Sequence, residues 1–140
     1  MQDAPAIDTT CLRVARERAG LSQNDLARHL GLAGGVRISR WERGEARPRS
    51  PELLRSLADV LDVTPRDLLV PPENGPDLRW LRFAAGLTVA QAAAAANCAV
   101  STMKRWEVGG LRSPSGPTIS TLCEALGASP DEVRNALRAK

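Results

Sequence analysis

The sequence predicts an all-α protein that consists of two tandem units, each with five short helices. The first observation is compositional: the chain of 140 residues is 43% apolar but only 3% aromatic. A β-sandwich core favours β-branched and aromatic residues, whereas a core of Leu, Ala and Val suits packed helices. An internal repeat and a regular series of helix start and stop signals support the same fold class.

A segment near the N-terminus recurs in the second half of the chain. The sequence LRVARERAGLS starts at Leu12, and LRWLRFAAGLT starts 66 residues later at Leu78. The tripeptide Arg-Trp-Glu also occurs twice, starting at Arg40 and, 65 residues later, at Arg105. Agreement in two separate segments indicates a tandem duplication.

Three prolines and a glycine mark the boundary between the two units. Pro71, Pro72, Gly75 and Pro76 exclude a continuous helix in this segment. Each unit is close to the lower size limit for an independent hydrophobic core. We expect an N-terminal arm over residues 1–9, a first domain over 10–70, a linker over 71–76 and a second domain over 77–140.

Capping residues and apolar spacing place the helices in both units. Thr10, Ser22, Thr64 and Asp77 are the expected helix caps, and Asp25 completes a capping box with Ser22. In the first unit, the expected helices start near residues 10, 22, 35, 51 and 64. In the second unit, they cover residues 77–85, 88–96, 100–108, 117–126 and 130–139.

The second and third helices of the first unit carry a distinctive sequence. It runs Gly20-Leu21-Ser22-Gln23, then Leu26-Ala27, Leu30-Gly31 and Ile38-Ser39-Arg40-Trp41-Glu42-Arg43-Gly44. This sequence resembles the phage-repressor-like (XRE-type) helix-turn-helix family, as does the basic loop Arg47-Pro48-Arg49. The second unit is similar in its first and fourth helices and at Lys104-Arg105-Trp106-Glu107, but departs over residues 89–96. The resemblance covers about residues 10–139 and implies two lambda-repressor-like domains.

The resemblance implies that double-stranded DNA is the partner and that the third helix of each unit enters the major groove. Base edges in this groove distinguish all four base pairs, and arginine can form bidentate hydrogen bonds to guanine. In the first unit, Gln23 would bind a phosphate at the start of the second helix. The groove-facing residues would be Gly35, Val36, Arg37 and Arg40, and the residues for phosphates or a minor-groove edge would be Arg43, Arg47 and Arg49.

The second unit is a weaker candidate for DNA binding. Val89 occupies the position of the phosphate-binding glutamine, and the unit has fewer basic residues. Its DNA-facing residues would be Val100, Ser101, Thr102, Lys104, Arg105 and, in the following loop, Arg112. Two interpretations stay open: a second DNA reader of lower affinity, and a degenerate unit that packs or binds a protein partner.

The tryptophans, two arginine–glutamate pairs and most cysteines are expected to have structural roles. Trp41 and Trp106 are expected in the core, although an indole can also stack on a base. The resemblance implies two ion pairs that hold the third helices in place, Arg16 with Glu42 and Arg82 with Glu107. His29 is expected to face solvent or a phosphate, Cys11 and Cys123 to be core thiols, and Cys98 to be a small buried residue or a redox switch.

Charge and motifs restrict the function class. The net charge of +3 is too small for a general polyanion binder, but five arginines between residues 37 and 49 face only two acids. The chain has one histidine and lacks a Gly-x-Ser-x-Gly motif, a P-loop and a paired-carboxylate arrangement, so we expect no enzyme activity, cofactor or metal site. An odd number of cysteines, no signal peptide and no membrane span favour a cytoplasmic protein.

We therefore expect a sequence-specific DNA-binding protein that regulates transcription, as a monomer or a homodimer. Two alternatives stay open. One is an antitoxin-like adapter whose second unit binds a protein partner, and the other is a replication-associated or DNA-end-binding architectural protein.

Overall fold

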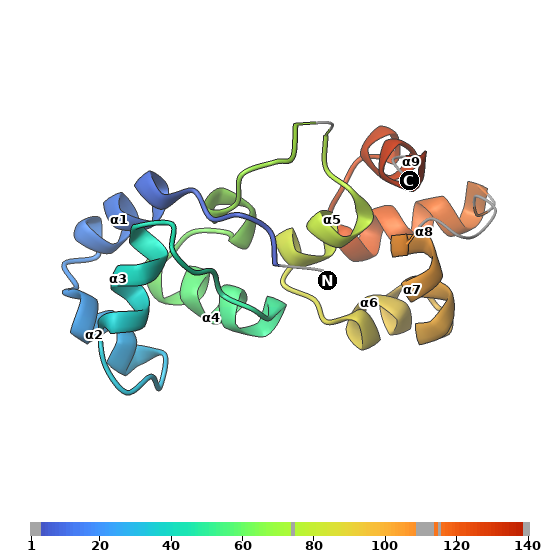
Figure 1. The fold of residues 1–140 in the computed structure, drawn as a ribbon. Helices are drawn as coiled ribbons and strands as arrows, with labels where there is room; N and C mark the ends of the chain where they lie inside the picture. Colours follow the sequence, from blue (N-terminus) through green and yellow to red (C-terminus); the bar gives the residue numbers. More distant parts are fainter. Residues whose placement is uncertain (1–3, 74, 109–113, 115, 139–140) are drawn as a thin grey trace. The chain divides into compact units, whose positions relative to one another are not determined.

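The computed structural model describes residues 4–73, 75–108, 114 and 116–138. The chain divides into two compact units, Met1–Val70 and Pro71–Lys140. The first unit contains α1 (Thr9–Arg18), α2 (Gln23–His29), α3 (Val36–Glu42), α4 (Pro51–Leu61) and the 3-10 helix η1 (Pro65–Leu68). The second contains α5 (Leu78–Ala84), α6 (Val89–Ala95), α7 (Val100–Val108), α8 (Gly116–Leu126) and α9 (Pro130–Arg138) (Figure 1). The prediction of an all-α protein with two tandem five-helix units is confirmed.

Every helix of the first unit contributes to its core. Leu12 of α1, Leu26 of α2, Ile38 of α3, Leu57 of α4 and Leu68 of η1 are all completely buried. Full burial of such a side chain contributes about 1.5–3 kcal/mol of hydrophobic free energy. The core therefore fixes α3 against the rest of the unit, although α3 has only 7 residues.

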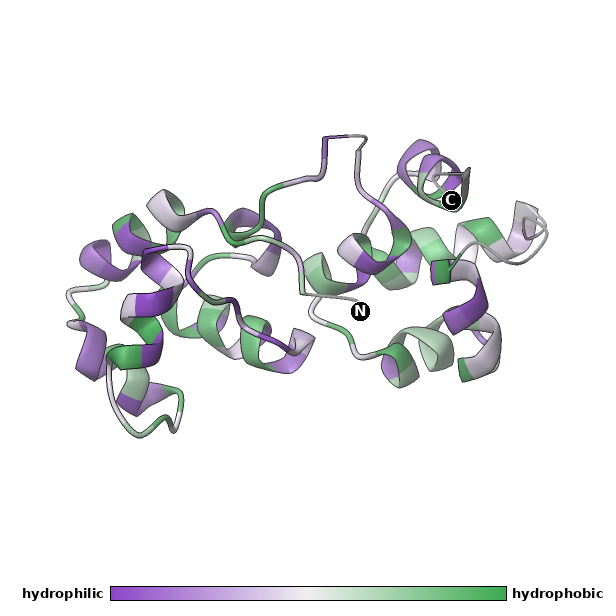
Figure 2. Ribbon diagram, in the orientation of Figure 1, coloured by the Kyte–Doolittle hydropathy of each residue, from purple (hydrophilic) through white to green (hydrophobic). Residues whose placement is uncertain are grey.

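The core of the second unit is built in the same way but with smaller side chains in its second helix. Ala92 and Ala93 of α6 are buried, as are Leu81 of α5, Met103 of α7 and Leu122 of α8. Figure 2 shows α6 coloured as hydrophobic along most of its length, whereas most residues of α2 are hydrophilic. In α6, alanines thus stand where α2 has Asn24, Leu26, Arg28 and His29.

The helix caps agree with the sequence analysis at three positions and differ at one. Ser22 and Asp25 form a reciprocal capping box, and Asp77 caps α5. Thr64 caps η1. The expectation that Thr10 caps the first helix is wrong: Asp8 does so, because its Oδ1 accepts a 3.0 Å hydrogen bond from the backbone N–H of Cys11. Thr10 lies inside α1, which starts at Thr9.

The described part of the N-terminal arm pairs with the end of the first unit. Ile7 and Leu69 form an isolated antiparallel β-bridge. The backbone N–H of Asp8 donates to the carbonyl oxygen of Leu68 at 2.8 Å, and that of Val70 donates to Ala6 at 3.0 Å. These contacts fix the arm on both sides of Ile7, which is itself buried.

Trp41, Trp106 and His29 lie where the sequence suggested, whereas Cys98 and Cys123 are less buried than expected. Trp41 and Trp106 are buried, which confirms their core position, and His29 is exposed. Cys98 and Cys123 are partly buried, and burial raises the pKa of each thiol.

The expectation for Cys11 is wrong, because this thiol is exposed instead of lying in the core. Its pKa is nevertheless raised, chiefly by a hydrogen bond to Asp8. Among the described residues, no helix is both long and apolar enough to cross a membrane.

Candidate nucleic-acid interface

Helix α3 has one buried side and one exposed side. Ile38 and Trp41 are three residues apart, and their side chains are 0% and 1% exposed. Val36 is 74% exposed, and Arg37 and Arg40 are exposed as well. Because side chains three or four residues apart share a helix face, Val36, Arg37 and Arg40 form one continuous surface. We call this surface the α3 face.

An ion pair fixes the C-terminal end of α3 to α1. The Arg16 guanidinium donates from Nε to Glu42 Oε2 at 2.5 Å and from Nη2 to Glu42 Oε1 at 3.1 Å. Its Nη1 donates to the carbonyl oxygen of Leu21 at 2.9 Å, which ties the α1–α2 turn to the same group. The hydrogen bond to Glu42 raises the pKa of Arg16, so the guanidinium stays charged. The carboxylate of Glu42 is therefore neutralised within the protein and does not repel an anion.

The second unit repeats this arrangement. Arg82 donates to the Glu107 carboxylate at 2.6 and 3.2 Å and to the carbonyl oxygen of Leu87 at 3.1 Å. Both predicted ion pairs, Arg16–Glu42 and Arg82–Glu107, are present. In each unit, an arginine of the first helix thus binds both the third helix and the turn that follows the first helix.

Gly35 lies at the contact between α2 and α3, and its expected position in the groove is wrong. The residue is buried, and its N–H donates to Asn24 Oδ1 at 2.9 Å. A Cβ at this position would lie 2.6 Å from Asn24 Oδ1 and 3.0 Å from backbone atoms of Gln23 and Asn24. Gly35 therefore permits the close approach of two helices and presents no side chain to DNA.

Gln23 also differs from the simple expectation of a phosphate contact. Its Nε2 donates to Glu42 Oε1 at 3.3 Å, which places its amide in the Arg16–Glu42 network. Its side chain is partly buried. In the free protein, Gln23 thus links α2 to α3. To bind a phosphate, its amide would have to donate a second hydrogen bond or rotate away from Glu42.

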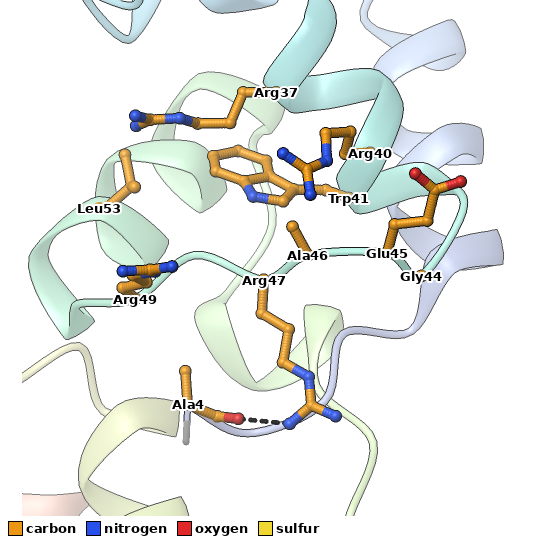
Figure 3. A pocket seen from close by; sticks show the side chains of 10 residues that line it. All are labelled: Ala4, Arg37, Arg40, Trp41, Gly44, Glu45, Ala46, Arg47, Arg49 and Leu53. Atoms are coloured by element: carbon orange, nitrogen blue, oxygen red, sulfur yellow. Dashed lines mark hydrogen bonds between the residues drawn. The ribbon is translucent and has the colours of Figure 1, made fainter. Parts of the chain in front are cut away.

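A hollow of about 660 Å³ lies beside the α3 face in the first unit. Figure 3 shows four guanidinium groups around it, from Arg37, Arg40, Arg47 and Arg49, with the Trp41 indole on one wall. Arg47 Nη1 donates to the backbone carbonyl oxygen of Ala4 at 2.6 Å. The lining residues are Ala4, Arg37, Arg40, Trp41, Gly44, Glu45, Ala46, Arg47, Arg49 and Leu53.

Most positive charges around this hollow have no acidic partner. Within the described part of the chain, Arg37, Arg40 and Arg49 make no hydrogen bond or ion pair. Arg43 pairs with Glu45 at 3.1 Å, but both side chains are more than half exposed. Such an exposed pair contributes little and can exchange its partner. The hollow therefore has the electrostatic character of an anion-binding surface.

In the second unit, α7 presents a different set of side chains. Ser101, Lys104 and Arg105 are exposed, Thr102 is partly buried and Val100 is 38% exposed. Val108, at the end of α7, is 72% exposed. Arg112 lies outside the described residues. The helix thus carries two exposed cations, and its C-terminal end is apolar.

Two contributors to the site were not identified from the sequence. Asn24 binds the N–H of Gly35, and the signal for it was the pair Gly34-Gly35 directly before the third helix. Ala4 binds Arg47 through a backbone carbonyl, which every residue carries. No sequence signal exists for such a contact, because the position of the arm depends on its pairing with residues 68–70.

Two short helices joined by a tight turn, the second of which exposes basic side chains, define a helix-turn-helix protein. A family model for the helix-turn-helix domain matches the chain twice, over residues 10–69 and 75–137, and the chain belongs to this family. The resemblance noted in the sequence is thus confirmed as two tandem helix-turn-helix units, a type of domain that binds DNA. No curated protein and no solved structure matches the chain.

Proposed function

We propose that this protein binds specific sequences in double-stranded DNA and regulates transcription by occupying them. The observation that carries the proposal is the α3 face, on which Val36, Arg37 and Arg40 are exposed while the opposite side of the helix is buried. A helix about 10 Å wide fits the major groove, which is about 12 Å wide. An α3 face with two unpaired guanidinium groups suits the acceptor atoms of guanine.

Each side chain of the α3 face would recognise a different base. Arg37 and Arg40 would donate to O6 and N7 of guanine, and each bidentate contact discriminates by about 1–3 kcal/mol. Val36 would contact a thymine methyl group. In the second unit, Val100, Ser101, Thr102 and Arg105 would face the groove, with Lys104 alongside.

The arginines beside the α3 face would bind the DNA backbone. Arg47 and Arg49 line the hollow, and Arg43 lies at the end of α3. Phosphate contacts of this kind orient a protein on DNA but carry no base information. Their removal should therefore weaken binding to all sequences about equally.

The proposal includes a cytoplasmic location and leaves the oligomeric state, monomer or homodimer, to the experiment. The free state of all three cysteines supports a reducing compartment. The two alternative functions, an adapter that binds protein through its second unit and an architectural protein, differ from the proposal in sequence selectivity.

Selection of binding sites from random duplex DNA with the full chain tests the proposal. A specific regulator should enrich a defined motif, and Arg40→Ala should relax one position of that motif. Arg47→Ala should keep the motif and lower the affinity for every sequence. If no motif is enriched, the claim of sequence-specific binding is wrong.

Salt dependence separates the proposal from an adapter. Neutralisation of six to eight phosphates should make log K fall with log[salt] at a slope of about −5 to −7. An adapter should show little affinity for the DNA and a shallow slope, and it should retain a protein partner. An architectural protein should show the steep slope without a motif.

A further inference from the structure

The two ion pairs give an exact correspondence between the recognition helices of the two units. Glu42 binds Arg16 in the first unit, and Glu107 binds Arg82 in the second. The preceding residues, Trp41 and Trp106, are buried in both. Position by position, Arg40 therefore corresponds to Arg105, Arg37 to Thr102 and Val36 to Ser101.

At these matched positions, one residue is shared and two differ. Arg40 and Arg105 are both exposed, so both helices offer a guanidinium at the same place. Arg37 is exposed, whereas Thr102 is shorter and partly buried. Val36 is 74% exposed and apolar, whereas Ser101 offers a hydroxyl group. The two helices therefore present different donor patterns to a groove.

Two residues beside these positions also differ between the helices. Arg43 at the end of α3 corresponds to Val108, which is 72% exposed. Ser39 corresponds to Lys104, an exposed point charge that lacks the fork geometry of arginine. Of the arginines assigned to base contacts, α3 thus carries two, Arg37 and Arg40, and α7 carries one, Arg105.

From these differences we propose that the DNA site of one chain is asymmetric. This inference rests on the proposed function. The half-site under α3 specifies two guanines, through Arg37 and Arg40, whereas the half-site under α7 specifies one, through Arg105. The two half-sites share the guanine read by Arg40 and Arg105 and differ at the position read by Arg37 and Thr102. A protein that reads DNA through pairs of identical units would select equal half-sites.

Reciprocal substitutions test this asymmetry in the full chain. Site selection with the wild type should return two unequal half-sites with one guanine in common. Arg37→Thr should lower the preference for one guanine in the stronger half-site by about 5- to 150-fold. Thr102→Arg should create a preference for a guanine at the matching position of the weaker half-site. Arg105→Ala should relax the shared guanine in the weaker half-site only.

The outcomes separate this inference from the proposed function. A motif with two equal half-sites, or one that Arg37→Thr leaves unchanged, overturns the asymmetry while sequence-specific binding stands. A motif with a single half-site that Arg105→Ala does not alter also overturns it, because the second unit then reads no base. Failure to enrich any motif contradicts the proposed function itself. Circular dichroism melting checks that each variant is folded. For the Arg37 and Arg105 variants this is expected, because both side chains are exposed.

Discussion

The guanidinium of Arg16 and the carboxylate of Glu42 are joined by two hydrogen bonds, of 2.5 and 3.1 Å, between the first and third helices of the first unit. The Arg16 side chain is 12% exposed and that of Glu42 6%. The pair is therefore shielded from water, unlike most surface ion pairs. The pair holds α3, the helix that carries Arg37 and Arg40, against α1.

Removal of Arg16 should destabilise the first unit strongly. Arg16→Ala leaves the carboxylate of Glu42 poorly solvated and without its partner, a situation that costs about 3–5 kcal/mol. Arg43→Ala is the matched control, since Arg43 pairs with Glu45 on the surface and should change stability by less than about 1 kcal/mol. Urea unfolding, followed by amide hydrogen exchange to resolve the two units, measures both. Equal stability of the two variants would show that the buried pair is not structural.

The contact between α2 and α3 should depend on the absence of a side chain at position 35. Gly35→Ala places a methyl group 3.0 Å or less from Asn24 and Gln23, including backbone atoms, so the helices must move apart. We expect a loss of about 1–3 kcal/mol in stability and a weaker affinity for DNA. Gly34→Ala is the control, because nothing lies within 4 Å of its Cβ position. If both variants unfold at the same urea concentration, the close approach is not required.

Trp41 should be essential for the fold of the first unit. Its side chain is 1% exposed, and truncation to alanine should cost about 3–5 kcal/mol through the cavity that it leaves. Thermal melting of Trp41→Ala and Trp41→Phe should give a graded loss, with the phenylalanine variant nearer the wild type. A Trp41→Ala variant as stable as the wild type would contradict a core role.

The capping box of α2 should be sensitive to acid. Hydrogen bonds from the backbone and side chain of Ser22 lower the pKa of Asp25 from its ordinary value of 3.8. Because the pKa is lower in the folded state, the stabilisation from this cap is present above about pH 4. It is lost as the pH falls through the folded-state pKa. The sign follows because the ionised carboxylate accepts these hydrogen bonds more strongly than the protonated acid does.

Titration of the Asp25 carboxyl group by NMR measures this shift directly. The midpoint should lie below 3.8 in the wild type and return toward it in Ser22→Ala. Asp25→Asn should remove the corresponding pH dependence from the amide exchange of α2. A midpoint at or above 3.8 in the wild type would show that the capping box does not lower the pKa of Asp25.

The fold of the protein was largely predictable because the same helix signals occur in both copies of the repeat. Apolar spacing, caps and the paired Arg16–Glu42 and Arg82–Glu107 residues all recur. The sequence did not decide between Thr10 and Asp8 as the cap, because both side chains have an oxygen that can accept a hydrogen bond from the helix backbone. In the structure, Asp8 accepts this bond from the N–H of Cys11. The expectation for Cys11 failed because a residue's burial depends on whether it lies on the buried or the exposed side of α1. The residue type alone does not reveal this.

The candidate site was predictable in its side chains but not in its backbone contacts. The exposure of Arg37 and Arg40 follows from the burial of Ile38 and Trp41 on the same short helix. The family resemblance placed Gly35 in the groove, yet the turn directs it against Asn24. Local spacing sets which side of a helix faces outward, whereas the packing of the turn is a tertiary property.

The most direct test of the account measures the contact between Arg40 and a guanine base. In the selected DNA site, each guanine is replaced in turn by 7-deazaguanine, which lacks the N7 acceptor, and Kd is measured for the wild type and for Arg40→Ala. One replacement should weaken wild-type binding by about 5-fold or more and leave the Arg40→Ala affinity unchanged. Equal losses in both proteins at every guanine would contradict the claim that the α3 face reads bases.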